Sequence, residues 1–135
     1  MILVLDSEAV NALATRSSGM QRVKAAMRAA VESGGDVVVP TVVLAELYRS
    51  SSHNASINSM LSREQADVQL RDTDRTLASY VGGVLAAAQA GAEDIVDAHC
   101  VATVVEQGRG VVLTGDPDDL TRLAAAYPTV TVRST

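Results

Sequence analysis

Aromatic residues are nearly absent from this sequence of 135 residues. It contains no Trp and no Phe, and its three Tyr stand at positions 48, 80 and 127. RNA-recognition modules stack bases on aromatic rings, so the composition argues against that class of protein. The hydrophobic core has to be aliphatic, and 21 Ala and 20 Val supply the material for it.

Cysteine and positive charge are also scarce. One Cys excludes a disulfide framework and a site built from several thiolates, and it suits a reducing compartment. The chain has 11 basic against 16 acidic residues, a formal net charge of −5. This balance argues against a protein that coats nucleic acid by bulk electrostatics.

Long hydrophobic runs are missing as well. The opening run Ile2–Leu5 is too short for a signal peptide and ends at Asp6. The longest uncharged run, Thr76–Ala92, contains polar residues and is too short to cross a bilayer. We therefore expect a cytoplasmic protein that does not associate with membranes.

Short valine-rich runs alternate with longer helical patterns along the chain, of which 47% is apolar. Strands are expected at residues 2–5, 37–39, 68–70, 111–114 and 130–132. Helices are expected at residues 7–15, 20–32, 41–49, 73–90, 94–107 and 117–126. This alternation predicts an α/β fold: a single three-layer α/β/α domain over residues 1–135, with a mostly parallel sheet of about five strands.

Two local expectations concern the middle of the chain. Thr41 follows Pro40 and is expected to be the N-cap of its helix. Ser50–Asp67 is rich in Ser and Asn, and we expect it to be a mobile polar excursion with at most a short helix.

Acidic residues follow the predicted strands. Asp6 comes directly after the first strand, and Asp116 follows the strand at 111–114. Glu46 lies in the second turn of the helix after the second strand, while Asp94 and Asp97 share one face of a buried helix. Because functional groups in parallel sheets gather beyond the carboxyl ends of the strands, these acids are expected at one edge.

Each acid also has a structural interpretation. Asp6, Asp94 and Asp116 stand where N-caps occur, and Asp97 stands where an acid favours a helix N-terminus. Glu46 is spaced to pair with Arg49 on the surface.

Taken together, the acids predict a metal site. Two carboxylates about 4 Å apart repel by roughly 4 kcal/mol at an effective dielectric constant near 20. A cluster of Asp6, Glu46, Asp97 and Asp116 would therefore raise several pKa values or bind cations. All the donors are oxygens, which favours Mg²⁺, with Mn²⁺ as the alternative. Magnesium sites of this kind act mostly on phosphates, with water as the nucleophile.

Four acidic segments carry a resemblance to a known family. They are Val4-Leu5-Asp6-Ser7, Val43-Leu44-Ala45-Glu46-Leu47, Ile95-Val96-Asp97-Ala98 and Leu113-Thr114-Gly115-Asp116-Pro117-Asp118-Asp119-Leu120. In order and spacing they resemble the acidic blocks of the PIN domain family, and such a short chain is most similar to the VapC-type toxin ribonucleases of type II toxin–antitoxin pairs.

The resemblance implies a metal-dependent endoribonuclease that cleaves RNA, forms a homodimer and is blocked by a cognate antitoxin. Asp6, Glu46, Asp97 and Asp116 match the family's catalytic acids, with Asp6, Asp97 and Asp116 as metal ligands and Asp94, Asp119 and Glu46 as further candidate ligands. Asp94 and Asp119 fall where additional acids occur. Thr114 matches a hydroxyl position beside the fourth acid, and Ser7 and Arg49 are candidates for supporting the ligands or contacting substrate.

Three other functions stay open. A PIN-type nuclease with a housekeeping role in RNA processing would share every motif. Asp6-Ser7-Glu8 and Gly115-Asp116 also resemble, faintly, motifs of haloacid dehalogenase-type phosphatases and receiver domains, but the single Lys, Lys24, lies far from every strand end. The third alternative is an inactive binding scaffold, which would not bind Mg²⁺ or Mn²⁺.

Overall fold

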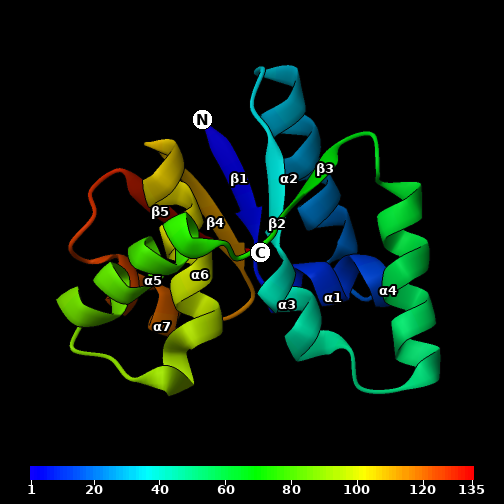
Figure 1. The fold of residues 1–135 in the computed structure, drawn as a ribbon. Helices are drawn as coiled ribbons and strands as arrows, with labels where there is room; N and C mark the ends of the chain where they lie inside the picture. The colour runs from blue at the N-terminus through cyan, green and yellow to red at the C-terminus, as the bar shows by residue number, and fades with distance from the viewer.

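A sheet of five parallel strands forms the centre of the protein in the computed structural model, which describes residues 1–135 (Figure 1). Its strand order is β3-β2-β1-β4-β5. The strands are β1 (Ile2–Leu5), β2 (Val37–Pro40), β3 (Val68–Arg71), β4 (Gly110–Thr114) and β5 (Val130–Ser134). Every residue of β1, β2 and β4 is buried, as expected for parallel strands covered on both faces.

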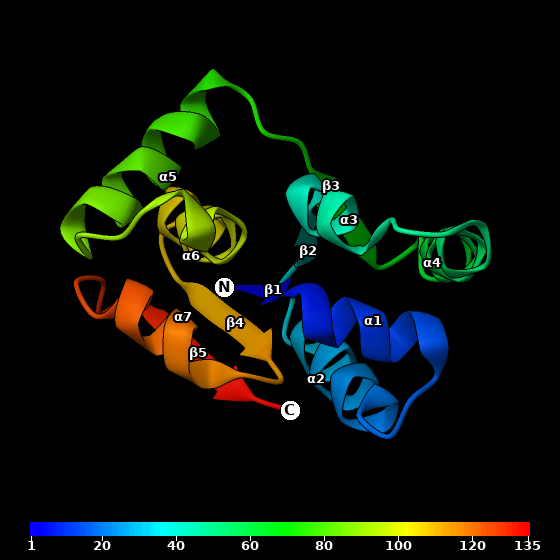
Figure 2. The ribbon, with the colours of Figure 1, turned by 90° about the horizontal axis from the view of Figure 1, so that it is seen from below.

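Helices cover both faces of this sheet. They are α1 (Ser7–Thr15), α2 (Met20–Glu32), α3 (Thr41–Leu47), α4 (Ser51–Arg63), α5 (Arg75–Ala87), α6 (Ile95–Gln107) and α7 (Pro117–Ala124), with a 3-10 turn η1 (Ala92–Asp94) before α6. α1, α2 and α4 pack together on one side, and α5, α6 and α7 on the other (Figures 1 and 2). The expected three-layer α/β/α fold is confirmed.

The side of the sheet on which the chain adds strands reverses between β1 and β4. From β1 it runs outward through β2 to β3, and then crosses back to β4 and β5 on the other side of β1. Right-handed crossovers then place the helices after β1 and after β4 on opposite faces. Open α/β sheets bind their ligands beyond the carboxyl ends of the strands at such a switch point, which here are the ends of β1 and β4. Figure 2 looks onto this edge.

β1 and β4 pair along their whole lengths, from Ile2 opposite Gly110 to Leu5 opposite Leu113. A Cβ atom on Gly110 would lie 2.5 Å from the carbonyl oxygen of Ile2, so the start of this pairing requires a glycine. At the other end, the backbone N–H of Asp6 donates to the carbonyl oxygen of Leu113 over 3.2 Å. The two strand ends are thus level with each other.

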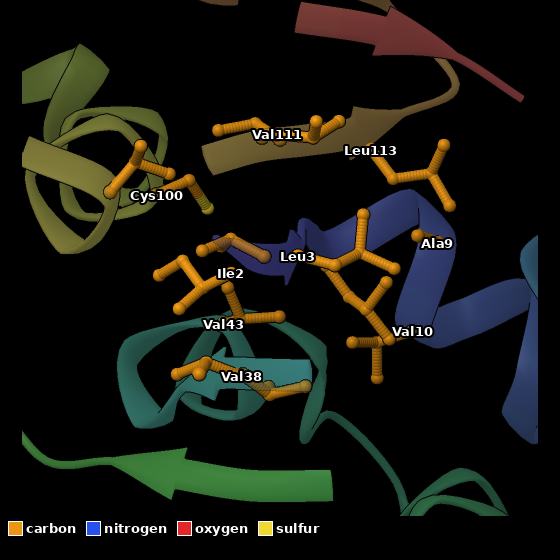
Figure 3. Packing of buried hydrophobic residues seen from close by; sticks show 14 of the residues in the cluster. Ile2, Leu3, Ala9, Val10, Val38, Val43, Cys100, Val111 and Leu113 are labelled. Atoms are coloured by element: carbon orange, nitrogen blue, oxygen red, sulfur yellow. The ribbon is translucent and has the colours of Figure 1, made fainter. Parts of the chain in front are cut away.

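The core consists of one cluster of 33 buried hydrophobic residues. Figure 3 shows Cys100 of α6 and Val10 of α1 on opposite sides of the strand that carries Leu3. Cys100 is fully buried and free. No helix is both long and apolar enough to cross a membrane.

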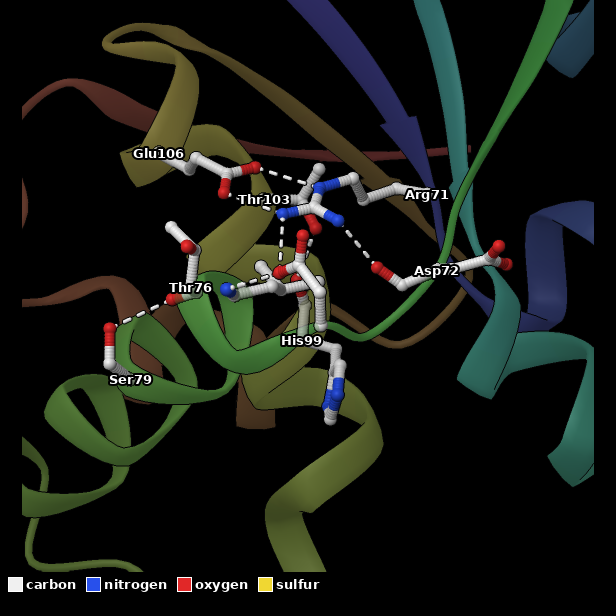
Figure 4. Close-up of polar contacts among 9 residues, drawn as sticks. Arg71, Asp72, Thr76, Ser79, His99, Thr103 and Glu106 are labelled. Carbon is white, nitrogen blue, oxygen red and sulfur yellow. Dashed lines mark hydrogen bonds and ion pairs between the residues drawn. The ribbon is translucent and has the colours of Figure 1, made fainter.

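Arg71 fastens the edge strand β3 to the helical layer (Figure 4). Its Nε and Nη2 atoms donate to the two carboxylate oxygens of Glu106 on α6, over 2.9 and 2.7 Å. Nη2 also donates to Asp74 over 3.0 Å, and Asp74 in turn caps α5 by accepting from the N–H of Leu77. This bidentate pairing holds the end of β3 against α6.

Two local expectations are wrong. Residues 51–63 form α4 rather than a loose polar excursion, because Ile57 and Met60 lie three residues apart on one helical face and are buried. Thr41 is the first helical residue of α3 and not its N-cap; Pro40 holds that position, and no side chain caps the helix. The α3 and α5 helices also end at Leu47 and Ala87, earlier than expected.

The buried face of α4 yields a stability prediction. We expect Ile57→Ala to lower the free energy of unfolding by about 2–5 kcal/mol, because it leaves a cavity against α1. Ser59→Ala on the exposed face of the same helix should change it by less than about 0.5 kcal/mol. Urea denaturation measures both variants; equal, small effects would mean that α4 is not packed onto the domain.

Candidate active site

Asp6 lies between β1 and α1, at the N-cap position of the helix. Its Oδ1 accepts a hydrogen bond of 2.9 Å from the N–H of Ala9, so it caps the helix while pointing into the carboxyl edge of the sheet. Only 4% of the residue is exposed. Burial raises the pKa of the carboxyl above its ordinary value of 3.8, and the charge of Glu46 adds to the shift. Hydrogen bonds from Thr114 and from backbone N–H groups oppose it.

Thr114 links the ends of β1 and β4. Its side chain is fully buried, and its hydroxyl group lowers the pKa of the Asp6 carboxyl. The same hydroxyl oxygen accepts a hydrogen bond of 2.9 Å from the N–H of Asp116. Asp116 stands at the N-cap position of α7, but its carboxylate makes no capping hydrogen bond. The Asp116 carboxylate is therefore free for another role, whereas a residue that served only as a helix cap would use its carboxylate for the cap.

Asp97 lies in the first turn of α6 and is surrounded by negative charge. Burial, followed by the charges of Asp6, Glu46, Asp119 and Asp94, raises its pKa to about 6 from the ordinary value of 3.8. Acids far apart in the sequence thus act electrostatically on Asp97. This carboxylate carries no hydrogen bond or ion pair that would offset the repulsion.

Glu46 stands on the exposed side of α3, within electrostatic range of Asp6 and Asp97. It does not pair with Arg49, because the Nη1 atom of Arg49 donates to the carbonyl oxygens of Ala45 (2.9 Å) and Tyr48 (3.0 Å). The surface ion pair considered above is therefore absent.

Glu8 is an acid of this cluster that the sequence analysis did not assign to the site. Its carboxylate lies so close to Gly115 that a Cβ atom on this glycine would overlap it, which places Glu8 beside the loop between β4 and α7. Its pKa is raised by burial and by the charges of Asp6 and Asp116. The available signal was its position two residues after Asp6, in the first turn of α1.

Asp94 and Asp119 differ from the other acids because both pair with the guanidinium group of Arg122. Nη2 of Arg122 lies 3.1 Å from Oδ2 of Asp94 and 3.7 Å from Oδ1 of Asp119. Asp94 precedes α6, whereas Asp119 and Arg122 are one turn apart on α7. By contrast, Asp6, Glu8, Glu46, Asp97 and Asp116 take part in no ion pair.

The donors suit a hard divalent cation, since the unpaired acids offer only oxygen atoms and their charges repel one another. No three His, Cys, Asp or Glu side chains stand close enough to share one ion. The carboxylates would have to turn inward to bind it. Next to Asp6, the hydroxyl of Ser7 is buried without a hydrogen-bond partner. An unpaired polar atom of this kind is rare away from sites that bind water, ions or ligands.

The crowding around Asp97 yields a prediction about stability. The Asp97 carboxyl binds its proton more tightly in the folded protein than in the unfolded chain, because its pKa is raised by folding. The ionised form of Asp97 therefore destabilises the fold at neutral pH. We expect Asp97→Asn to raise the metal-free free energy of unfolding by about 1–2 kcal/mol at pH 7. The gain should shrink as the pH falls through about 6 toward 3.8, where the wild-type group becomes protonated.

Chemical denaturation at several pH values in the presence of EDTA measures this difference. Asp67→Asn, at an exposed acid outside the cluster, is the control and should show no such pH-dependent gain. A lower metal-free stability of Asp97→Asn at pH 7 would mean that Asp97 acts as a stabilising acid at the N-terminus of α6.

The comparisons with known proteins agree with this geometry. The whole chain has the fold of a chain in the crystal structure of VapBC2 from Rickettsia felis, bound to a DNA fragment from their promoter. The TM-score is 0.63 and the sequence identity 16%, over 99% of this chain and 98% of that one. No curated protein sequence matches. The PIN domain model matches residues 3–126, which include all the acids described above. The chain belongs to the PIN domain family.

Proposed function

We propose that this protein is a metal-dependent endoribonuclease and the toxin of a toxin–antitoxin pair. One observation supports the proposal: Asp6, Glu46 and Asp97 come from separate segments and lie within electrostatic range of one another, Asp116 acts on the neighbouring Glu8, and none of these acids has a cationic partner. Membership of the PIN domain family supports nuclease chemistry, and the likeness to a VapBC2 chain supports the toxin role.

Asp6, Asp97 and Asp116 would hold a Mg²⁺ or Mn²⁺ ion, with Glu46 facing it from α3. Such an ion supplies positive charge for the phosphate oxygens and lowers the pKa of water that it binds. Thr114 orients the Asp6 carboxylate and fixes the backbone of Asp116. Glu46 is exposed, so a phosphodiester strand can approach the acids from the side of α3.

The rival phosphotransfer functions require a basic residue on the phosphate. Lys24, the single Lys of the chain, lies on α2 and approaches Glu64, 4.0 Å away. It is not among the charges that act on Asp6, Glu8 or Asp97. The homodimer, the cytoplasmic location and RNA as substrate stay predictions from the sequence.

The test is cleavage of total RNA by the purified, antitoxin-free protein with Mg²⁺ or Mn²⁺, followed by mapping of the cleaved ends. We expect recurrent cleavage sites that disappear in EDTA. Asp6→Asn and Asp116→Asn should lower the cleavage rate by at least about 100-fold. Mutation of a group that only supports a metal ligand lowers activity by up to about 100-fold, and loss of a ligand itself should cost at least as much. Both should also weaken Mn²⁺ binding in a titration.

Asp67→Asn is the matched control, because it removes an exposed carboxylate that is not one of the acids of the proposed site. This variant should keep wild-type cleavage. Equal Mn²⁺ binding by wild type and both site variants would contradict the site. Mn²⁺ binding without any RNA cleavage would contradict the ribonuclease function and favour a binding scaffold or another phosphoester substrate.

A second prediction concerns the antitoxin. Arg49 donates to carbonyl oxygens at the end of α3 and not to the carboxylates, so a partner can supply the acids with a cation. We expect the cognate antitoxin to cross α3 near Tyr48, whose hydroxyl donates to Asn58 of α4 over 2.6 Å, and to place a basic side chain among the carboxylates.

Hydrogen exchange of the protein alone and in the antitoxin complex checks this arrangement. Protection should appear in α3, at the start of α4 and at the strand ends that carry Asp6 and Asp116. Protection limited to α2 and β5 would show that inhibition occurs elsewhere on the molecule.

A further inference from the structure

A groove that contains two arginines and no acidic side chain runs between α2 and β5. It consists of two hollows, of about 300 and 130 Å³. The larger hollow is lined by Ser18, Gly19, Arg22 and Thr135, and the smaller one contains Arg133 and three alanines of α2, namely Ala26, Ala29 and Ala30. Arg22 precedes Ala26 by one turn of α2, and Arg133 precedes Thr135 by two residues, so that both share one face of the sheet. The hollows therefore follow one another along the same two elements.

The groove is open because α2 leaves β5 uncovered. α2 packs on β1 and β2, whereas β5 is the edge strand on the far side of β4. The three alanines of α2 that line the groove have little side chain with which to fill the space. Arg133 lies opposite Leu113 in the pairing of β5 with β4, and its side chain is exposed in this space.

The positive charge of the groove is not neutralised by the protein. Arg22 and Arg133 are exposed and take part in no ion pair. Residues 9–31 contain four basic residues and no acid, although the whole chain has a net charge of −5. Neither arginine is among the charges that shift the pKa values of the acids at the carboxyl edge. A positive groove on an acidic protein attracts negatively charged ligands to that place.

The groove ends beside the acids. The backbone N–H of Thr135 donates to the carbonyl oxygen of Thr114 over 2.8 Å, and the hydroxyl of Thr114 accepts from the N–H of Asp116. Figure 2 shows the C-terminal end of β5 next to α2 and to the end of β4. A strand of nucleic acid bound at the acids therefore reaches the groove past Thr114 and Thr135.

We propose that this groove binds the phosphate backbone of the RNA strand to one side of the cleaved bond, with Arg22 and Arg133 each contacting a phosphate. The inference rests on the proposed ribonuclease function and adds a binding surface to it. A guanidinium group matches two oxygens of a phosphate. The groove has no aromatic side chain on which a base could stack, so it contacts the backbone and does not select a sequence.

Fluorescence anisotropy with labelled oligo(U) RNA measures the affinity in EDTA, where the proposed cleavage does not occur. We expect Arg22→Gln and Arg133→Gln each to weaken binding by about tenfold at low salt, as for a lost hydrogen bond between charged groups. Each variant should also reduce the slope of log affinity against log salt concentration by about 0.7, the value for one phosphate contact on a single strand. Oligo(A) should show the same losses, since every sequence has the same phosphates.

Arg28→Gln is the matched control. Arg28 is also exposed on α2, but it lines a different hollow, together with Glu64 and Asp67. Its replacement removes the same charge and should change the RNA affinity by less than about twofold, because a charge outside the groove is screened by salt. If Arg22 and Arg133 had only a structural role, their variants would have lower melting temperatures and the salt dependence of the wild type.

Three results would overturn the inference. They are a wild type that binds no RNA, wild-type RNA affinity in both Arg22→Gln and Arg133→Gln, and an equal loss of affinity in Arg28→Gln. Weaker antitoxin binding by Arg22→Gln without loss of RNA affinity would also overturn it, because the groove would then bind a protein partner.

Cleavage assays with Mg²⁺ separate this inference from the proposed function. We expect the two groove variants to raise the KM for RNA more than they lower kcat, because their contacts lie away from the cleaved bond. RNA cleavage with a wild-type KM in both variants would exclude the groove and leave the ribonuclease function standing. RNA binding that depends on both arginines without any cleavage would support the groove and contradict the ribonuclease function.

Discussion

The parallel pairing of β1 with β4 is the constraint on which the site depends. Residues 2 and 110 are more than a hundred positions apart, yet Gly110 lets the two strands approach closely from their first pair onward. The pairing ends level, with the N–H of Asp6 bonded to Leu113. The residues that follow therefore emerge side by side, so Thr114 accepts a hydrogen bond from the backbone of Asp116 and also lowers the pKa of the Asp6 carboxyl. A shift of one residue would separate these groups and turn the side chains to the opposite faces of the sheet.

Concentrating acids at this edge works against folding, and the rest of the molecule has to offset it. Burial and mutual repulsion raise the pKa values of Asp6, Glu8 and Asp97, so the ionised cluster is destabilising without a cation. The aliphatic core between the sheet and its helices supplies the compensating stability through buried apolar surface. At the edge of the sheet, the bidentate pairing of Arg71 with Glu106 attaches β3 to α6. Destabilising repulsion of this kind is common at functional sites, where a bound ligand relieves it.

The errors of the sequence analysis have local physical causes. Ser50–Asp67 looks like a loop because Ser and Asn dominate it, and those residues compete with the helical backbone for hydrogen bonds. Burial of Ile57 and Met60 outweighs this weak propensity, so the segment forms α4. Thr41 follows Pro40 and has a capping side chain, but β2 extends to Pro40 and the helix starts one residue earlier than a Thr cap would allow. Helix propensity and capping are small terms that tertiary packing readily overrides.

The sequence by itself determined the alternation of strands and helices, the aliphatic core and the acids that follow the strands, because periodicity and strand ends are local properties. It also carried the PIN resemblance, since the four acidic segments keep their order and spacing. Only the tertiary structure decided which acids have a cation. Arg122 meets Asp94 through the packing of α7 against α6, and Glu8 meets Asp116 through the loop after β4. Charge balance depends on distances of a few ångströms between separate elements, and no pattern along the chain encodes those distances.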